Sequence, residues 1–380
     1  MKNTSKFISV ILCIFLLTGC AEEKDRAISF ENRTAENNEK IIISAPTEYA
    51  SALSKVSERI ESNIPGLKIL FSEKDADIII TDRLPSDSFS EYMSLEDISG
   101  QIKNTVIPEL TVKNGNDIIG IPLFLKIESY WFDNLYYQAN SKSVPFSLSA
   151  VKEAIKSAEH GAIFDRSASE SFFWSTLAPY YLASGGTENE LGFADFNREK
   201  LTAAAESTAR LFKEKIVSVN EAANELFLSE RLMFYITDVS EIAAERHSLP
   251  INSEVSFAPD LIFDDGTAEL IVRSAFIAVK KALPKALVNK FLGELYSNEI
   301  LLNIIKSSGI PLACRIEYNN NSVPELVSGI NAVLSSPDVN IHYINCFWNE
   351  QTVSAVNNAI NIISKGNHNA KQAINILFSE

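Results

Sequence analysis

Residues 41–82, IIISAPTEYASALSKVSERIESNIPGLKILFSEKDADIIITD, decide the fold class of this chain. The apolar runs at 41–45, 67–71 and 76–82 each have the length of a buried strand. Between the first two runs, residues 49–60 carry apolar side chains at the spacing of one helix face. Strands that alternate with a helix in this way predict an α/β domain, with a mostly parallel sheet covered on both faces.

The remainder of the chain predicts a second, helix-rich half. Residues 118–132 form a long apolar and aromatic passage interrupted by polar residues, which predicts two successive strands at a crossover between lobes. A further strand is expected at 272–280, and the length of 380 residues indicates two domains. The predicted helices cover 148–158, 170–183, 198–213, 219–228, 284–296, 299–307, 323–334, 350–364 and 369–377.

The first twenty residues predict a lipoprotein signal. Lys2 and Lys6 precede an apolar run at 7–17 that is too short to cross a bilayer as a helix. Leu17-Thr18-Gly19-Cys20 resembles the bacterial lipobox, which implies cleavage before Cys20 and acylation of its thiol. The alternative is an ordinary signal with a cysteine there by chance. We therefore expect a signal peptide at 1–19 and a flexible, polar tether at 20–39.

The charge of the chain excludes several partners. The formal net charge is −15 for the whole chain, and removal of Lys2 and Lys6 with the signal makes it −17. Such a surface repels phosphates, so the chain is not expected to bind nucleic acid or to attach electrostatically to anionic lipid. The acyl chains on Cys20 would then be the link to the membrane.

The sequence contains no recognisable catalytic or metal-binding motif. There is no Gly-x-Ser-x-Gly elbow, glycine-rich phosphate loop or His-Glu-x-x-His, and the four histidines lack metal-ligand spacing. Acidic pairs such as Asp264-Asp265 suggest a hydrolase, but neighbouring side chains point in different directions, and glycoside hydrolysis needs carboxyls facing each other. We expect no enzyme activity, cofactor or metal. The sequence does not decide whether Cys314 and Cys346 form a disulfide, because it does not place the two thiols together.

Aromatic residues are concentrated beside polar ones. Flat apolar rings bordered by hydrogen-bonding groups suit a sugar, whose C–H faces stack on rings while its hydroxyls form hydrogen bonds. Taken one at a time, each ring is more typical of a core residue than of a ligand contact. The grouped residues are Tyr130, Trp131, Phe132, Tyr136, Tyr137, Phe172, Phe173, Trp174, Tyr180, Tyr181, Phe347 and Trp348.

The order of these features resembles that of the extracellular solute-binding lipoproteins of bacterial ABC importers, in the carbohydrate-binding family (family 1) that includes the maltose-binding protein. The resemblance covers most of the chain after the signal. It rests on the segments at 77–82, 95–98, 120–123, 131–134, 174–186, 274–279, 284–299, 309–312, 347–348 and 366–376.

The resemblance implies a two-lobed, periplasmic-binding-protein-like fold (type II), in which each lobe is a mostly parallel sheet flanked by helices. One lobe would combine residues 40–126 and 274–312, and the other residues 127–273 and 313–380. A monomeric, lipid-anchored protein outside the cell membrane, at a Gram-positive surface or in a periplasm, would hold a sugar in the cleft between the lobes. Hinge closure around the sugar would signal the loaded state to an ABC transporter permease.

The same resemblance assigns ligand contacts to nine residues. Carboxylates in this set would accept hydrogen bonds from sugar hydroxyls, and Trp174 and Trp348 would stack on pyranose faces. The expected ligand-binding residues are Thr47, Asp82, Lys126, Glu128, Trp174, Tyr181, Thr237, Asp238 and Trp348.

One segment departs from the family pattern. Residues 227–233 and 237–240 lack the glycines and the tryptophan that typically close over the sugar. This difference predicts another shape for the turn. The loss of the expected stacking ring also argues against an ordinary oligosaccharide ligand. The alternative function is that of a lipoprotein of the same fold that senses a ligand or acts as a scaffold without transport.

Overall fold

The computed structural model describes residues 39–378, except 103, 246–247, 250–252, 260–261, 265–267, 317, 319–321 and 368–369. The predicted signal peptide, the lipidation site Cys20 and all of the predicted tether but Glu39 lie outside the described residues, as do His247 and His368. No helix in the described ranges combines the length and apolar composition that crossing a bilayer requires.

The first sheet contains seven strands within the described residues. Its hydrogen-bonded order is β2-β1-β3-β11-β5-β4, with β12 paired to β11. The predicted strand at 67–71 is confirmed with the same bounds, and the strands expected at 41–45 and 76–82 are confirmed with shifted ends. The strands are β1 (Glu39–Ser44), β2 (Leu67–Phe71), β3 (Ile78–Thr81), β4 (Val112–Asn114), β5 (Asp117–Lys126), β11 (Glu269–Val279) and β12 (Asn340–Tyr343).

The sheet is mixed, where a mostly parallel sheet was predicted. β1 runs parallel to β2 and β3, but β11 is antiparallel to β3 and β5, and β5 is antiparallel to β4. A tight turn at Gly115 joins β4 to β5, and so short a connection forces antiparallel neighbours. The β-α-β pattern of residues 41–82 correctly indicated the parallel part of the sheet and carried no information about the strands added later.

The second sheet contains five strands in the order β10-β6-β9-β7-β8. The pairs β10–β6 and β6–β9 are antiparallel, whereas β9–β7 and β7–β8 are parallel. The prediction of two successive strands in residues 118–132 is confirmed, because β5 ends at Lys126 and β6 begins at Glu128 in the other sheet. The strands are β6 (Glu128–Asp133), β7 (Ala162–Phe164), β8 (Val217–Val219), β9 (Phe234–Asp238) and β10 (Val255–Phe257).

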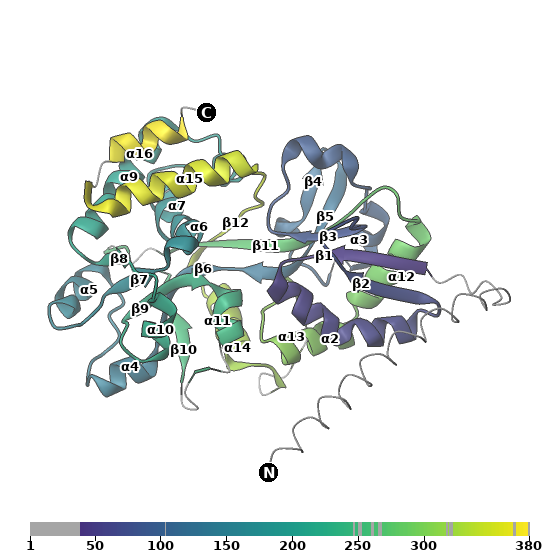
Figure 1. Cartoon of the computed structure of the whole chain (residues 1–380), viewed down its shortest axis with the longest axis horizontal. Helices are drawn as coiled ribbons and strands as arrows, with labels where there is room; N and C mark the ends of the chain where they lie inside the picture. Colours follow the sequence, from purple (N-terminus) through teal and green to yellow (C-terminus); the bar gives the residue numbers. More distant parts are fainter. Residues whose placement is uncertain are drawn as a thin grey trace, which may run out of the picture.

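Each sheet is flanked by helices, and the two units lie side by side with β11 and β6 running between them (Figure 1). Around the first sheet lie α2 (Thr47–Asn63), α3 (Glu96–Ile102), α12 (Lys285–Leu295) and α13 (Asn298–Ser308). The remaining helices are α4 (Asn134–Ala139), α5 (Leu148–Ile155), α6 (Ser169–Phe172), α7 (Ala178–Ala183), α8 (Glu188–Phe193), α9 (Arg198–Lys213), α10 (Ala223–Leu228), α11 (Val239–Glu245), α14 (Glu325–Leu334), α15 (Glu350–Ile362) and α16 (Ala370–Leu377).

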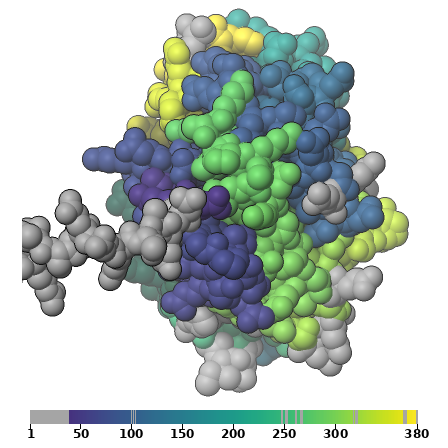
Figure 2. Space-filling view, turned by 90° about the vertical axis from the view of Figure 1, so that its right-hand side faces the viewer, coloured from purple at the N-terminus to yellow at the C-terminus, as the bar shows by residue number. Residues whose placement is uncertain are grey.

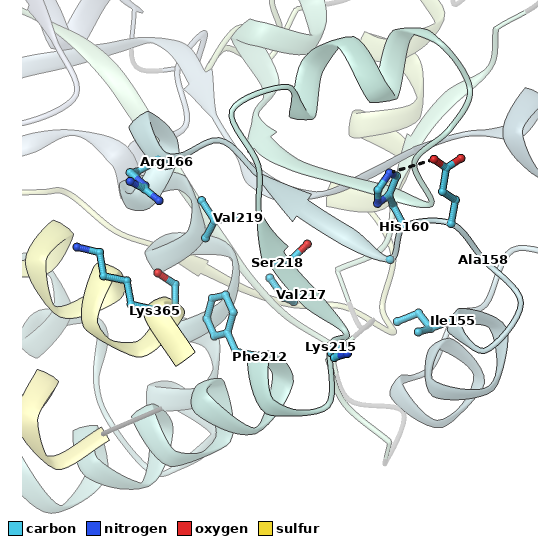
Figure 3. Close-up of a pocket in the computed structure, with 13 residues that line it drawn as sticks. Ile155, Ala158, His160, Arg166, Phe212, Lys215, Val217, Ser218, Val219 and Lys365 are labelled. Carbon is cyan, nitrogen blue, oxygen red and sulfur yellow. Dashed lines mark ion pairs between the residues drawn. The ribbon is translucent and has the colours of Figure 1, made fainter. Parts of the chain in front are cut away.

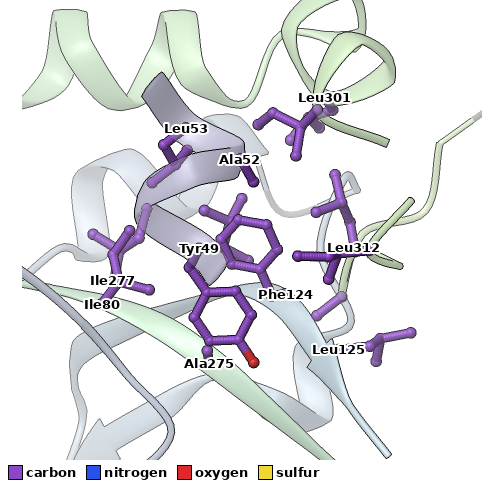
Figure 4. Packing of buried hydrophobic residues seen from close by; sticks show 14 of the residues in the cluster. Tyr49, Ala52, Leu53, Ile80, Phe124, Leu125, Ala275, Ile277, Leu301 and Leu312 are labelled. Atoms are coloured by element: carbon purple, nitrogen blue, oxygen red, sulfur yellow. The ribbon is translucent and has the colours of Figure 1, made fainter. Parts of the chain in front are cut away.

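Segments distant in the sequence build the first lobe together. Figure 2 looks along the long axis onto this lobe, where the green segment that holds α12 and α13 lies against the purple and blue N-terminal elements. The core beneath them packs α2 against the sheet, and the ring of Tyr49 stacks on Phe124 with centroids 4.4 Å apart (Figure 4). Burial of such apolar side chains is the main stabilising term of the lobe.

The predicted helix at 170–183 is confirmed but contains a wider turn. α6 and α7 are joined by a π-helical turn, Phe173–Leu177. Pro179 has no N–H to donate to the carbonyl of Ser175, so a regular α-helical hydrogen bond is missing at this place. The helix ends before the pair Gly185-Gly186, and Gly185 has the positive φ of +86° that is typical of a glycine after a helix.

Replacing Gly186 with alanine is expected to destabilise the second lobe by about 1–3 kcal/mol. A Cβ atom at this position would lie 2.2 Å from the Tyr181 ring, which is fully buried and donates its hydroxyl to Glu190. Gly293→Ala in α12 is the matched control: its Cβ meets no atom within 4 Å, and the better helix former should stabilise by up to about 1 kcal/mol. Urea unfolding of both variants measures the difference, and equal effects would contradict the packing argument.

Candidate functional site

A cluster of charged side chains lies where the two sheets meet, and we call it the junction cluster. The first sheet contributes the ends of β3 and β5. The second sheet contributes β6 and β9, helix α6 lies beside them, and β11 passes between the two sheets. Four of the nine predicted ligand-binding residues belong to it. The junction cluster consists of Asp82, Arg83, Lys126, Glu128, Glu170, Asp238 and Arg273.

Arg273 is the centre of the junction cluster. Its guanidinium is completely buried and forms an ion pair with Glu128 through Nη2. The same group lies 3.6 Å from Oδ2 of Asp82 and 3.6 Å from Oε1 of Glu170. A buried guanidinium requires such partners, because desolvation of an unpaired charge costs several kcal/mol.

A second cation, Lys126, lies directly opposite Arg273 in the β5–β11 pairing. Its ammonium is 2.9 Å from Oδ2 of Asp82 and 3.9 Å from Oε1 of Glu128. Arg83 completes the set with contacts to Asp82 at 3.2 Å and to Glu170 at 2.9 Å. Residues of both lobes therefore hold one another through ion pairs at the junction.

Two buried carboxylates face each other on the second sheet. Glu128 and Asp238 are directly opposite in the antiparallel β6–β9 pairing, and their exposed fractions are 3% and 7%. One oxygen of each, Oε2 of Glu128 and Oδ2 of Asp238, is buried without a hydrogen-bond partner. Like charges across a strand pair destabilise each other, so this arrangement has an energetic cost that packing alone does not explain.

The two predicted stacking residues lie against each other. The rings of Trp174 and Trp348 are stacked with centroids 4.8 Å apart, and the Arg273 guanidinium lies 4.3 Å from the centre of the Trp174 ring. Both tryptophans are 1% exposed, and their indole N–H groups bond to Glu170 and to the Leu191 carbonyl. In this conformation neither ring has a face open to a solute.

The charges of the junction cluster shift one another's pKa values. Burial alone would raise the pKa of Asp82, but Lys126 and Arg273 hold it well below its usual range. For Glu128 the burial outweighs the same two cations, and the nearby Asp238 adds to it, so the pKa of Glu128 rises to about 7. At neutral pH, Asp82 is therefore ionised while Glu128 is close to half-protonated.

Besides the two tryptophans, three predicted residues lie outside the junction cluster. Thr47 is exposed and lines a cavity of about 440 Å³ with Phe71 and Ser72, beside the end of β1. Tyr181 is buried, and its hydroxyl donates to Glu190 and accepts from the N–H of Asn197. Thr237 precedes Asp238 in β9, so the strand alternation directs its side chain to the opposite face, where it bonds to Glu241.

Sequence reasoning missed the central residue, Arg273, as well as Arg83, Glu170 and Tyr49. Arg273 did leave a signal, because it is the one charged residue in the largely apolar run at 270–279. A charge within a strand buried on both faces must meet a partner of opposite charge. The other three leave no comparable signal, since their positions at the junction depend on how the lobes meet.

Another cavity lies at the edge of the second sheet, about 580 Å³ in volume (Figure 3). It lies along β8 and includes Arg166, Lys215 and Lys365, all of which are solvent-exposed. His160 lies 3.5 Å from Glu159 at its rim. None of the nine predicted residues lines this cavity, and its cations can be solvated without a ligand.

Comparisons with known proteins identify the fold. No family model and no curated protein matches the chain. Among solved structures, a probable secreted solute-binding lipoprotein from Streptomyces coelicolor matches 90% of this chain and 98% of its own, at 12% identity and a TM-score of 0.70. A sugar transporter from Bacillus licheniformis in complex with stachyose aligns with 90% of this chain and 98% of its own chain, at 12% identity and a TM-score of 0.67.

A third similar structure is the GacH receptor of Streptomyces glaucescens, determined without ligand and in complex with acarbose. It covers 90% of this chain and 97% of its own, at 11% identity and a TM-score of 0.68. The predicted resemblance is confirmed at the level of the fold: the chain has the two-lobed α/β architecture of sugar-binding solute-binding proteins. At these identities the likeness shows the fold alone.

Proposed function

We propose that this chain is a lipid-anchored solute-binding protein on the outer side of a cell membrane. It captures a sugar or oligosaccharide between its lobes, and its closed form delivers the sugar to the permease of an ABC importer. Cys20 carries the anchor, and the protein performs no catalytic step. Similar structures described as complexes with stachyose, acarbose and maltose support a carbohydrate ligand.

The observation that carries this proposal is the set of unpartnered polar atoms in the junction cluster. Glu128 and Asp238 each offer a carboxylate oxygen, while Arg273 has Nε and Nη1 without hydrogen-bond partners. Tyr49, which interacts electrostatically with Asp238, adds a hydroxyl group that is also buried without a partner. Donors and acceptors in this combination match the hydroxyl groups of a sugar, which both donate and accept.

The strand connections explain how capture could be reported to a permease. β5 leads directly into β6 through Ile127, and β11 passes along the same junction. A ligand that bonds groups of both sheets stabilises the arrangement in which the lobes are together. The permease would then distinguish loaded from empty protein by the relative position of the lobes.

A thermal-shift screen against neutral mono- and oligosaccharides tests the proposal. A sugar at 100 times its dissociation constant should stabilise the protein by about 2.7 kcal/mol, visible as a higher melting temperature. The shift should disappear in Asp82→Asn and persist in Asp97→Asn, a control whose carboxylate pairs with Lys285 on the surface. A shift that survives Asp82→Asn would place the sugar elsewhere.

The alternative is a sensing or scaffolding lipoprotein of the same fold. It is favoured by the mutual stacking of Trp174 and Trp348, which leaves no ring face open in this conformation. A scaffold without a ligand predicts that no solute shifts the melting temperature, whereas a sensor would be stabilised by its own ligand. Genes for a histidine kinase beside the gene of this protein would favour sensing, and genes for a permease would favour import.

A further inference from the structure

When all of its groups are ionised, the junction cluster has four carboxylates and three cations. Asp238 is the carboxylate without a direct ion pair: within the described parts of the chain, no lysine, arginine or histidine nitrogen lies within 4 Å of it, and Lys126 interacts with it only at longer range. Its Oδ1 accepts hydrogen bonds from the N–H and hydroxyl of Ser240, and Oδ2 has no partner. The carboxylates are Asp82, Glu128, Glu170 and Asp238, and the cations are Arg83, Lys126 and Arg273.

The negative charge without a direct cationic partner lies where the strands β6 and β9 pair. Glu128 lies directly opposite Asp238, so their unpartnered oxygens belong to neighbouring side chains on one face of the sheet. The Tyr49 hydroxyl interacts electrostatically with Asp238 and is also unpartnered. Arg273 and Lys126 already face Glu128, so the carboxylate that still requires a nearby cation is that of Asp238.

We propose that the solute of this protein is an amino sugar, whose protonated amine binds between Glu128 and Asp238. The inference rests on the proposed function, and it specifies the chemical class of the solute. A primary ammonium has three N–H donors, which match Oε2 of Glu128, Oδ2 of Asp238 and the Tyr49 hydroxyl oxygen. The ligand amine replaces the proton that Glu128 otherwise retains.

Two observations select an amino sugar over other cations. The described residues contain no group of three or more histidine, cysteine or acidic side chains that could hold a metal ion, and hard cations require more oxygen ligands than this pair offers. Arg273 retains two unpartnered donor nitrogens, although three carboxyl groups lie within 4 Å of its guanidinium. Such donors suit neutral hydroxyl oxygens, as on a sugar ring.

Calorimetric titration at pH 7 with three related sugars tests the inference. Glucosamine carries the amine, N-acetylglucosamine keeps the substituent without its charge, and glucose lacks it. We expect glucosamine to bind at least about 30-fold more tightly than the other two, the effect of a buried charged hydrogen bond. Asp238→Asn should abolish this preference, while the exposed control Glu299→Gln should retain it.

The variants and probes separate the outcomes. If Asp238→Asn does not fold, as judged by its melting curve, Glu128→Gln provides the same test from the opposite strand. Equal affinity for glucose and glucosamine would overturn the inference and leave the proposed function intact. Binding of putrescine or serine with no binding of any sugar would support the amine site and overturn the sugar assignment. Preference for glucosamine that persists in both variants would also overturn the inference.

Discussion

An Arg273→Met variant is expected to lose about 3–5 kcal/mol of unfolding free energy, the effect of breaking a buried ion pair from one side. The side chains are similar in length, so the loss comes from charge and not from a large cavity. Glu128 would lose its ion-pair partner, and both Asp82 and Glu170 would lose a nearby guanidinium. A melting temperature lower by roughly 10 °C is the expected readout.

Two further variants distinguish the loss of this buried charge from a nonspecific loss of stability. Arg59→Met breaks the ion pair with Glu299, in which both side chains are more than half exposed, and should change stability by less than about 1 kcal/mol. Arg273→Met combined with Glu128→Leu should recover part of the stability, because the carboxylate left without a partner is removed as well. A double variant no more stable than Arg273→Met would contradict the electrostatic account.

The elements that sequence reasoning located well are those whose pattern is local. α9 has the predicted bounds of 198–213, because Asn197 caps its first turn and apolar residues recur along one face. β2 likewise matches a short apolar run with clear ends. Sheet direction was predicted less well, since pairing of β11 with β3 and β5 joins residues about 150 to 200 positions apart, which no local pattern encodes.

The candidate site shows the same limit. Asp82, Lys126, Glu128 and Asp238 were predicted, and the structure brings them together because each stands at the end of a strand. The stacking of Trp174 on Trp348 joins helix α6 and its π-helical turn to the loop before α15, and this contact depends on packing of the complete lobe. Their predicted role toward a ligand stays a prediction.

The stability of the protein is expected to decrease by roughly 3 kcal/mol between pH 4.5 and 7 because of Glu128 alone. The pKa of this carboxyl is about 7 in the folded protein and 4.5 in the unfolded chain. The folded state therefore binds the proton more tightly. The resulting stabilisation is complete below pH 4.5 and is lost as the pH rises through 7. Asp82 acts in the opposite sense only below pH 3.8, because its pKa is lowered on folding.

Glu128→Gln isolates this effect, since glutamine keeps an oxygen for Arg273 and does not titrate. The difference in unfolding free energy between wild type and Glu128→Gln should change by roughly 3 kcal/mol from pH 4.5 to 8, in the direction that disfavours the wild type at the upper end. Glu299→Gln, which alters an exposed carboxylate, should show no such change. A wild-type-to-variant difference that stays constant over this range would mean that Arg273 keeps Glu128 ionised, and the junction cluster would then hold its excess charge without a proton.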